Sequence, residues 1–356
     1  MNDMERKKKK VLFFTSGSVG GAERVTLTVA KLLPREEYDV KIIFVCKQIS
    51  HIDEFLPEWM KSIHVKIRNI WDFTTFRLFK LIKAEHPDAV FSSLNYLNVR
   101  VILAARFSSV KNIIVRNNIG WSRWDPMMRQ LARMTYPYVT CSIMQTEEMK
   151  LEFKQIFPKI SHKFKVIPNP LDLDTIIYKL KNATSPYTDD DTLKYVFVGR
   201  IDPIKRIEIL LQAFAHVLKQ NHNSSLTLVG DINLCPEYFK SLMRIADDLK
   251  ISQNIIFTGF SDNPYRYIKY ANCFVLPSKM EGNPNVLHEA MYLQVPVVAT
   301  RSIPIIDQIV TSDRGFTVAV DDVNALSEAM QKAAVMTITK PYTYTGGRNA
   351  FIDLLK

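Results

Sequence analysis

Short apolar runs alternate with longer amphipathic segments along nearly the whole chain. The runs have the length of buried strands, and the segments between them repeat apolar residues at the three- and four-residue intervals of a helix. Strands that alternate with helices in this way predict parallel sheets covered by helices. We expect strands at 11–14, 40–45, 65–67, 89–91, 113–115, 139–142 and 165–167 in the first half, and at 195–198, 226–229, 255–258, 274–276, 297–299 and 316–320 in the second.

The length of the chain and one break in this pattern predict two domains. With 356 residues the chain is too long for one ordinary core. Pro168 and Pro170 end the first series of strands, and a polar, turn-rich stretch follows them. We therefore predict a first domain at 1–170, a connector at 171–193 and a second domain at 194–339.

The segment 277–291 combines a helix start with two glutamates. Asn283 suits the N-cap and Pro284 the first helical position, so the backbone N–H groups from about Asn285 onward would face an anion. Glu281 precedes this helix and Glu289 lies within it, and a carboxylate can accept two hydrogen bonds from a vicinal diol. A phosphate flanked by diols describes a nucleotide sugar. A capped surface helix with solvated glutamates would show the same pattern.

A second cluster follows the strand expected at 195–198. Gly199 and Arg200 come directly after this strand, Lys205 follows, and an amphipathic helix begins at Ile207. Ligands in open α/β sheets bind at the carboxyl ends of the strands, so both cations are candidates to hold a diphosphate. The alternative is a basic helix start kept for solubility, which the helix dipole disfavours.

The first expected strand leads into paired glycines, Gly20 and Gly21, and then into an amphipathic helix. The spacing differs from the GxGxxG dinucleotide pattern, but paired glycines allow a ligand to approach the backbone closely. Because any turn from strand to helix can contain glycine, this feature has little weight by itself.

Together these segments resemble glycosyltransferase family 4, which consists of retaining enzymes with the GT-B fold. Four features are similar to the family: the segment 20–23, the segment 166–170, the sequence from Gly199 and Arg200 to Lys205, and the pair Glu281 and Glu289 with seven residues between them. The resemblance implies an α/β architecture of the GT-B type, with two Rossmann-like domains whose parallel sheets face across a cleft. It also implies that 340–356 packs back on the first domain.

The same resemblance implies roles for individual residues. Arg200 and Lys205 would hold the donor diphosphate, Glu289 would bind the ribose and Glu281 would contact the transferred sugar. The predicted donor site comprises Gly20, Gly21, Gly199, Arg200, Lys205, Gly259, Glu281, Gly282, Asn283, Asn285, Val286 and Glu289, with Glu281, Arg200 and Lys205 as its catalytic residues.

The acceptor is expected on loops of the first domain. The candidates are Asn95, Tyr96, Asn117, Asn118 and Trp121. Many relatives have a histidine after a middle strand of this domain, but the segment 89–95 lacks one, and His86 precedes it. We therefore assign no acid or base to the first domain.

Charge is divided unevenly between the two halves. Residues 1–180 hold 29 Lys and Arg against 18 Asp and Glu, whereas residues 181–356 hold 18 against 18. A basic excess of this kind indicates a polyanionic partner, either nucleic acid or an anionic membrane surface.

Two amphipathic segments favour the membrane. The first is 121–134, where Trp124, Met127, Met128, Leu131 and Met134 share one helical face beside Arg123, Arg129 and Arg133, and the second is 73–83, with Phe73, Phe76, Phe79 and Ile82 beside Arg77, Lys80 and Lys83. Each segment could equally be a helix packed on the core of the first domain.

Neither a metal nor a cofactor is expected. The segments 172–174 and 189–191 fit the DxD pattern of metal-dependent glycosyltransferases, but both fall in the connector and not at a strand end. The four cysteines lack the spacing of a metal site, and no GxSxG hydrolase motif is present.

No apolar run approaches the roughly 20 residues that cross a bilayer, and the basic start lacks a signal-peptide apolar stretch. The expected location is the cytoplasm, peripheral on the inner face of the cell membrane.

These observations predict a metal-independent, retaining glycosyltransferase of polysaccharide biosynthesis. It would move a sugar from a nucleotide donor, in the first instance a UDP-sugar, to a lipid-linked or growing glycan acceptor, without binding nucleic acid. One alternative is a non-catalytic GT-B relative or a basic nucleic-acid-binding protein. A further alternative is a nucleotide-sugar epimerase or hydrolase on the same scaffold.

Overall fold

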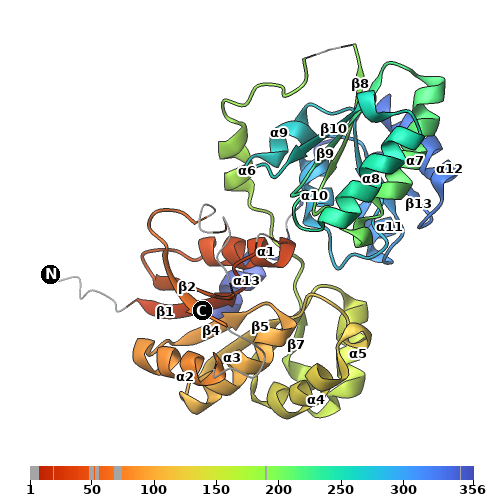
Figure 1. Cartoon of the computed structure of the whole chain (residues 1–356). Coiled ribbons are helices and arrows are strands. Elements are labelled where there is room, and N and C mark those ends of the chain that lie inside the picture. The colour runs from red at the N-terminus through yellow and green to blue at the C-terminus, as the bar shows by residue number, and fades with distance from the viewer. Residues whose placement is uncertain are drawn as a thin grey trace. The chain divides into compact units, whose positions relative to one another are not determined.

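A computed structural model describes residues 8–18, 20–47, 52, 56–67, 74–188, 191–344 and 346–356. The chain divides into two compact units, each built on one parallel sheet. Unit 1 consists of Met1–Pro170 together with Thr345–Lys356, and unit 2 is Leu171–Tyr344 (Figure 1). The two parallel sheets confirm the predicted α/β class with two Rossmann-like domains.

Unit 1 has a seven-stranded sheet in the order β3-β2-β1-β4-β5-β6-β7. Its strands are β1 (Lys9–Thr15), β2 (Tyr38–Cys46), β3 (Lys61–Lys66), β4 (Ala89–Ser92), β5 (Asn112–Arg116), β6 (Cys141–Met144) and β7 (Phe164–Val166). Its helices are α1 (Gly21–Lys31), α2 (Thr74–Glu85), α3 (Asn95–Phe107), α4 (Pro126–Thr135), α5 (Glu147–Ile156) and α13 (Arg348–Leu355).

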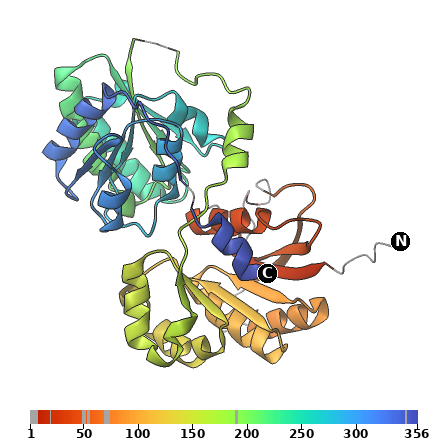
Figure 2. The same ribbon diagram turned by 180° about the vertical axis from the view of Figure 1, so that it is seen from behind.

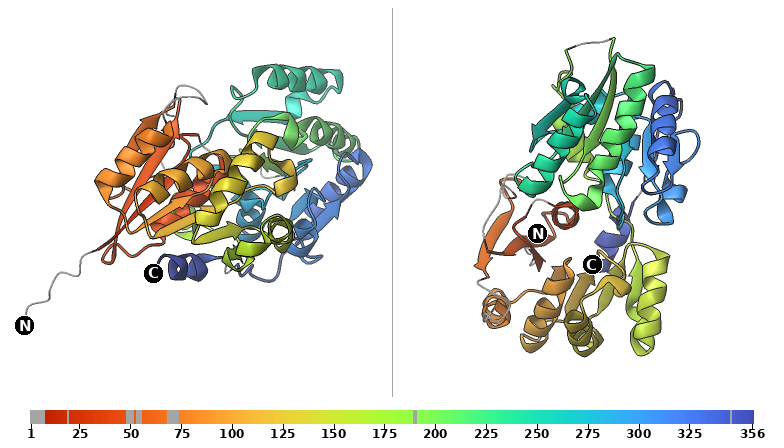
Figure 3. Two further views of the ribbon diagram at one scale, coloured as in Figure 1. Left: turned by 90° about the horizontal axis from the view of Figure 1, so that it is seen from below. Right: turned by 45° about the vertical axis from the view of Figure 1, so that its right-hand side comes forward.

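Both faces of this sheet are buried, which explains why its central strands are continuous apolar runs. Successive residues of β1 point to opposite faces: Leu12 and Phe14 join a core with α2, α3, α4 and α5, whereas Val11 and Phe13 join a core with α1 and α13. Figure 2 shows α13 beside α1 on the sheet of unit 1, and the same layers can be followed from below in Figure 3.

The C-terminal helix is part of the core of unit 1 because Phe351 is fully buried there, at 6.3 Å from the Phe91 ring. The chain enters this helix through Gly347, where space is short. A Cβ atom at this position would lie 2.3 Å from the Cγ2 atom of Ile167 and 2.4 Å from the carbonyl oxygen of Pro168. The start of α13 therefore touches the segment by which the chain leaves unit 1.

Unit 2 has a six-stranded parallel sheet in the order β10-β9-β8-β11-β12-β13 around a single core. Its strands are β8 (Leu193–Val198), β9 (Ser224–Val229), β10 (Ile255–Gly259), β11 (Cys273–Leu276), β12 (Val297–Thr300) and β13 (Gly315–Val318). Its helices are α6 (Leu173–Leu180), α7 (Ile207–Gln220), α8 (Pro236–Asp248), α9 (Pro264–Lys269), α10 (Asn285–Tyr292), α11 (Ile305–Ile309) and α12 (Val323–Ala334).

Several predicted boundaries differ from the structure, and β13, for example, ends at Val318 and not at residue 320. β3 starts at Lys61, four residues early, because it is an edge strand whose exposed polar positions hide its pattern. β6 starts at Cys141, since the apolar Val139 belongs to a turn closed by its backbone bond to Tyr136. The expected connector contains helix α6, capped by Asp172, and belongs to unit 2.

The segment 340–344 also belongs to unit 2, so only the chain beyond it is grouped with unit 1. In the described part of the chain, no helix has the length and apolar character needed to cross a bilayer.

Candidate active site

The strand order of unit 2 defines a place for a ligand. The chain proceeds from β8 to β9 on one side and from β11 to β12 on the other, so the order reverses between the neighbours β8 and β11. Ligands of open α/β sheets bind at the carboxyl ends of the strands beside such a reversal. The segments that follow β8 and β11 contain the predicted cations and the predicted glutamates.

Lys205 and Glu281 form an ion pair across this position. The Nζ atom of Lys205 lies 2.7 Å from Oε1 of Glu281, and their side chains are only 15% and 11% exposed. The two segments are also joined through the backbone, since the N–H of Lys279 donates to the carbonyl oxygen of Ile204 at 2.9 Å. These contacts hold together residues that are 76 positions apart in sequence.

Arg200 is held differently. Its Nη2 atom lies 3.2 Å from Oδ2 of Asp202, and its side chain is 55% exposed. Asp202 is buried and also accepts a bond from the N–H of Ile204, which caps the 3-10 helix Pro203–Lys205. The sequence motif therefore supplies one nearly buried cation and one solvated cation at the same strand end.

Helix α10 begins one position later than predicted. Asn285 is its first residue and Pro284 occupies the N-cap in an extended conformation, so the prediction that Asn283 is the N-cap is wrong. The Asn283 side chain is buried and turns instead toward His288, whose Nε2 atom lies 3.3 Å from Oδ1 of Asn283. Glu289 lies in α10 and is 5% exposed.

His288 was not expected at the site and is the most perturbed base there. Its Nδ1 atom lies 2.6 Å from the hydroxyl oxygen of Tyr342, and the Tyr344 ring packs 4.1 Å from its own ring. Burial of the imidazole lowers the pKa of His288 to about 4. Burial raises the pKa of the Tyr342 hydroxyl to about 12.

The glycines of this edge have backbone explanations. A Cβ atom at Gly230 would lie 1.9 Å from the carbonyl oxygen of Gly199, which fixes the approach of the segments after β8 and β9. Gly259 has a φ of +73° where the register of β10 shifts, a conformation that suits glycine. Gly259 is the last residue of β10, and Gly199, Gly282, Asn285 and Val286 lie in the segments that follow β8 and β11. The donor-binding role of these residues stays a prediction.

Unit 1 has its own reversal, between β1 and β4. Here Oε1 of Glu23 accepts hydrogen bonds from the hydroxyls of Ser16 and Ser18, at 2.5 and 2.8 Å. A Cβ atom at Gly20 would lie 2.4 Å from Oε2 of the same carboxylate, whereas one at Gly21 would meet nothing within 4 Å. A side chain at Gly20 would therefore displace the end of the Glu23 side chain, whereas Gly21 is open on its Cβ side.

Two of the predicted acceptor residues lie in the core of unit 1. Asn117 accepts a bond from the Tyr136 hydroxyl at 2.6 Å and donates to Ser142 at 3.0 Å. Trp121 is 6% exposed and packs edge-on against Phe153 at 5.5 Å. Their side chains satisfy the fold, which argues against direct acceptor contact.

Asn118 and Asn95 remain near strand ends. Asn95 opens α3 just after β4, and Asn118 accepts a bond from Arg116 and donates to the carbonyl oxygen of Ser93. Arg116 closes β5, is 1% exposed and donates also to Asn169. Tyr96, the other candidate, is 40% exposed.

Arg116, Glu23 and His288 were not predicted as site residues from the sequence. A usable signal existed for Arg116, since a charge directly after the apolar residues 113–115 marks a strand end. No comparable signal identified His288, because its partner Tyr342 is 54 residues away.

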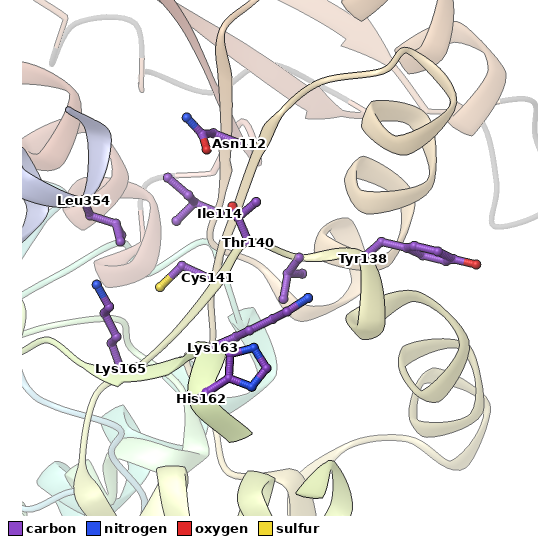
Figure 4. A pocket seen from close by; sticks show the side chains of 10 residues that line it. Asn112, Ile114, Tyr138, Thr140, Cys141, His162, Lys163, Lys165 and Leu354 are labelled. Carbon is purple, nitrogen blue, oxygen red and sulfur yellow. The ribbon is translucent and has the colours of Figure 1, made fainter. Parts of the chain in front are cut away.

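A pocket of about 490 Å³ lies in unit 1 at the amino ends of β5 and β6 (Figure 4). This is the opposite edge of the sheet from the predicted acceptor residues Asn95 and Asn118. It is lined by Asn112, Ile114, Tyr138, Val139, Thr140, Cys141, His162, Lys163, Lys165 and Leu354. Burial raises the pKa of its Cys141 thiol to about 11, so this cysteine is unreactive near neutral pH.

The metal hypotheses find no geometric support in the described residues. None of their His, Cys, Asp and Glu side chains gather in groups of three or more that could hold a metal ion. Asp172 accepts a bond from the N–H of Thr175 and so caps α6. Asp189 and Asp190 lie outside the described residues.

Comparison with known proteins agrees with this architecture. Residues 19–175 match the family model "Glycosyltransferase Family 4", and residues 181–338 match "Glycosyl transferases group 1". A capsular polysaccharide biosynthesis glycosyltransferase of Staphylococcus aureus, CapH, is 25% identical over 82% of this chain and 81% of its own length. A galactosyltransferase of Escherichia coli that acts on α-D-GlcNAc-diphosphoundecaprenol is 22% identical over 79% of this chain and 76% of its own.

Among solved structures, Anabaena HepE in complex with UDP and glucose superposes with a TM-score of 0.74 at 17% identity, covering 98% of this chain and 95% of that protein. The residues that the two family models match include every strand of both parallel sheets except β1. The chain belongs to the glycosyltransferases of family 4 with the GT-B fold, as predicted, and it is a glycosyltransferase.

Proposed function

We propose that the protein is a retaining glycosyltransferase that transfers a sugar from a UDP-sugar to a lipid-linked glycan acceptor. The observation that supports this most directly is the Lys205–Glu281 pair at the strand reversal of unit 2, beside the start of α10. A cation, a carboxylate and the N–H groups at a helix start suit the diphosphate and the hydroxyls of a nucleotide sugar. HepE binds UDP and UDP-glucose on a similar fold, which supports the uridine assignment.

The proposed chemistry is electrostatic. The bond between the anomeric carbon and the diphosphate oxygen breaks as the acceptor oxygen forms its bond on the same face. The acceptor proton passes to an oxygen of the departing diphosphate. Lys205, Arg200 and the N–H groups of α10 stabilise the charge that develops on this leaving group, and Glu281 positions the transferred sugar. No metal takes part in this scheme.

A lipid-linked acceptor is supported by the relatives. The Escherichia coli enzyme uses a diphosphoundecaprenol acceptor, and a Campylobacter jejuni relative that is 24% identical over 90% of this chain is named for a diphospho-undecaprenol substrate. On the protein, Asn95, Tyr96 and Asn118 of unit 1 are the residues we assign to the acceptor side.

Peripheral binding to anionic lipid is part of the same proposal. On α4 and the turn after it, Met127, Met134 and Tyr138 are 45%, 64% and 47% exposed at helical spacing. The exposed Arg123 and Arg133 belong to the same segment. Trp124 is buried at 4%, so it is not part of this surface, contrary to the predicted apolar face.

The second amphipathic segment gives weaker support. Leu78 and Ile82 of α2 are buried in the core, and only Phe76 is strongly exposed, at 51%. Phe73 lies outside the described residues. We therefore assign the membrane surface to α4.

The proposal is tested by screening nucleotide sugars for thermal stabilisation of the protein and assaying those that bind with a diphosphoundecaprenol-linked sugar. A ligand at 100 times its dissociation constant adds about 2.7 kcal/mol of stability. We expect UDP-sugars to stabilise it and one of them to give a longer glycan with an α-linkage. Donor conversion without acceptor would favour the epimerase or hydrolase, and stabilisation by no nucleotide sugar would overturn the proposal.

A further inference from the structure

Buried side-chain contacts connect the loop that precedes α10 to the C-terminal end of unit 2. Tyr342 contacts Nδ1 of His288 at 2.6 Å, and Nε2 of His288 contacts Oδ1 of Asn283 at 3.3 Å. His288 is 3% and Asn283 8% exposed, so both side chains are shielded from bulk solvent. A residue of the predicted donor site is thus joined to a residue almost 60 positions later.

The roles of donor and acceptor in this chain follow from the orientation of Asn283. Because its Oδ1 atom faces the ring, Nε2 of His288 must bear the proton and donate it. Nδ1 is then the acceptor of the neutral imidazole and receives the hydroxyl hydrogen of Tyr342. The low pKa of His288 keeps the ring neutral near pH 7, as this arrangement requires.

The segment around Tyr342 is itself fixed. Arg314 is 7% exposed, and its Nη2 atom donates to the carbonyl oxygens of Lys340 and Pro341 at 3.2 and 3.0 Å. Its guanidinium lies 5.0 Å above the ring of Tyr342. The Tyr344 ring covers the other partner, His288. The segment 340–344 is also the stretch from which the chain proceeds to α13 of unit 1.

We propose that Tyr342, His288 and Asn283 form a positioning relay, through which the segment 340–344 sets the conformation of the donor-binding loop before α10. His288 and Tyr342 act through Asn283 and need not touch the donor. The inference rests on the proposed function, because Asn283 matters only if the loop binds a nucleotide. It adds that donor affinity depends on a tyrosine outside the nucleotide site.

Two substitutions of His288 separate the two halves of the relay. A glutamine amide replaces Nε2, so His288→Gln keeps the bond to Asn283, whereas His288→Asn places its oxygen near Nδ1 and keeps only the bond to Tyr342. We expect the dissociation constant of UDP, measured by calorimetry, to rise about tenfold in His288→Asn and no more than about threefold in His288→Gln.

Tyr342→Phe removes only the hydroxyl and keeps the ring. It should weaken UDP binding about threefold in the wild-type background and have no effect in the His288→Gln background, where nothing remains for the hydroxyl to orient. Thermal unfolding of each variant separates a loss of affinity from a loss of fold. Equal UDP affinity in His288→Asn, His288→Gln and wild type would overturn the relay while leaving the proposed function intact.

A measurement on the unliganded wild-type protein is independent of any donor. Nitrogen NMR of the His288 ring should find the proton on Nε2 and none on Nδ1 at pH 7. A proton on Nδ1 would mean that His288 donates to Tyr342 and that Asn283 is reversed, which would also overturn the relay. If wild type shows the expected tautomer but does not bind UDP, the proposed uridine donor fails, and with it the functional part of the relay.

Discussion

The two units share one topology but place different chemistry at the point where strand order reverses. Between β8 and β11, unit 2 has the Lys205–Glu281 ion pair and the more exposed Arg200. Between β1 and β4, unit 1 has hydroxyl groups bonded to one buried carboxylate, Glu23, and its buried cation, Arg116, is bonded to two asparagine side chains. The cations of unit 2 pair with carboxylates, whereas Arg116 is bonded to amides.

This difference separates two kinds of recognition that the same fold can supply. A cation whose charge is balanced by a nearby carboxylate can exchange that partner for a phosphate, with little change in burial. Hydroxyls and amides offer many weaker and directional bonds, which suit the hydroxyls of a sugar. The net charge of the two halves shows a different distribution. The excess of Lys and Arg over Asp and Glu lies in the first half of the chain and not in the half that contains Lys205 and Arg200.

The largest expected effect is on the cations of unit 2. A charge-assisted hydrogen bond contributes roughly 1.5–3 kcal/mol, and each 1.4 kcal/mol is a factor of ten in rate. Lys205→Ala should therefore lower turnover about 100-fold, and Arg200→Ala, which is more exposed, about tenfold, in initial-rate assays with the donor. Lys240→Ala, on the solvent face of α8, is the matched control. Wild-type turnover in Lys205→Ala would show that this cation does not stabilise the leaving group. The proposed difference between the strand reversals of unit 1 and unit 2 would then be wrong.

Next in size is an acid sensitivity confined to unit 2. The folded pKa of His288, about 4, is below its usual value near 6.5, so the unfolded chain takes up the proton first. Its contribution is complete above pH 6.5 and is lost as pH falls toward 4, by about 2 kcal/mol between pH 7 and pH 5. His288→Gln should lack this loss.

The positions of the tryptophans allow the loss of stability at acid pH to be measured separately for each unit. All four lie before residue 125, in unit 1, so their fluorescence follows that unit, whereas far-UV circular dichroism follows both. Urea unfolding at pH 7 and pH 5 should show the His288-dependent shift in the dichroism only. The same shift in the fluorescence would mean that the two units unfold as one.

A smaller effect separates the two glutamates. Glu289→Gln should weaken UDP binding about tenfold, in line with a lost charge-assisted bond to the ribose. Glu281→Gln should leave UDP affinity equal or slightly higher, because it releases Lys205 from its carboxylate, and should instead lower turnover with the complete donor. Calorimetry and steady-state rates distinguish the two, and equal losses of UDP affinity would show that the assignment is wrong.

The smallest expected effect concerns the surface of unit 1. Binding to vesicles with anionic lipid should weaken several-fold in the double variant Met127→Ser, Met134→Ser, and about fivefold in Arg133→Ala, since each basic residue near such a surface contributes about 1 kcal/mol. Met243→Ser, on the partly exposed face of α8, is the control in the other unit. Equal sedimentation with neutral vesicles, or none with either, would remove the lipid from the proposal.

Part of this comparison could be predicted from sequence, because local apolar runs mark where the strands of unit 2 end. The position of Lys205 and Glu281 after two such runs was predictable, but their contact was not, since it depends on which strands are neighbours. Asn283 was predicted as a cap from local preference, and tertiary burial against His288 overrode it. Trp124 fits the amphipathic pattern of the segment 121–134 and was therefore predicted on its exposed face. Its ring instead packs against Phe153 in the aromatic cluster of the core.

Gly347 joins the last helix to the point where the chain leaves unit 1, and Phe351 of that helix fills the core beneath β4. On a ribosome this makes unit 1 the last part to be completed, although its strands are synthesised first. At roughly 5–20 residues per second, the residues between Pro170 and α13 delay it by about 10–35 s. During that interval, the part of the sheet face that α13 covers is exposed, and unit 2 has time to fold. Loss of the last eleven residues should therefore affect yield and aggregation before it affects the chemistry of the donor site.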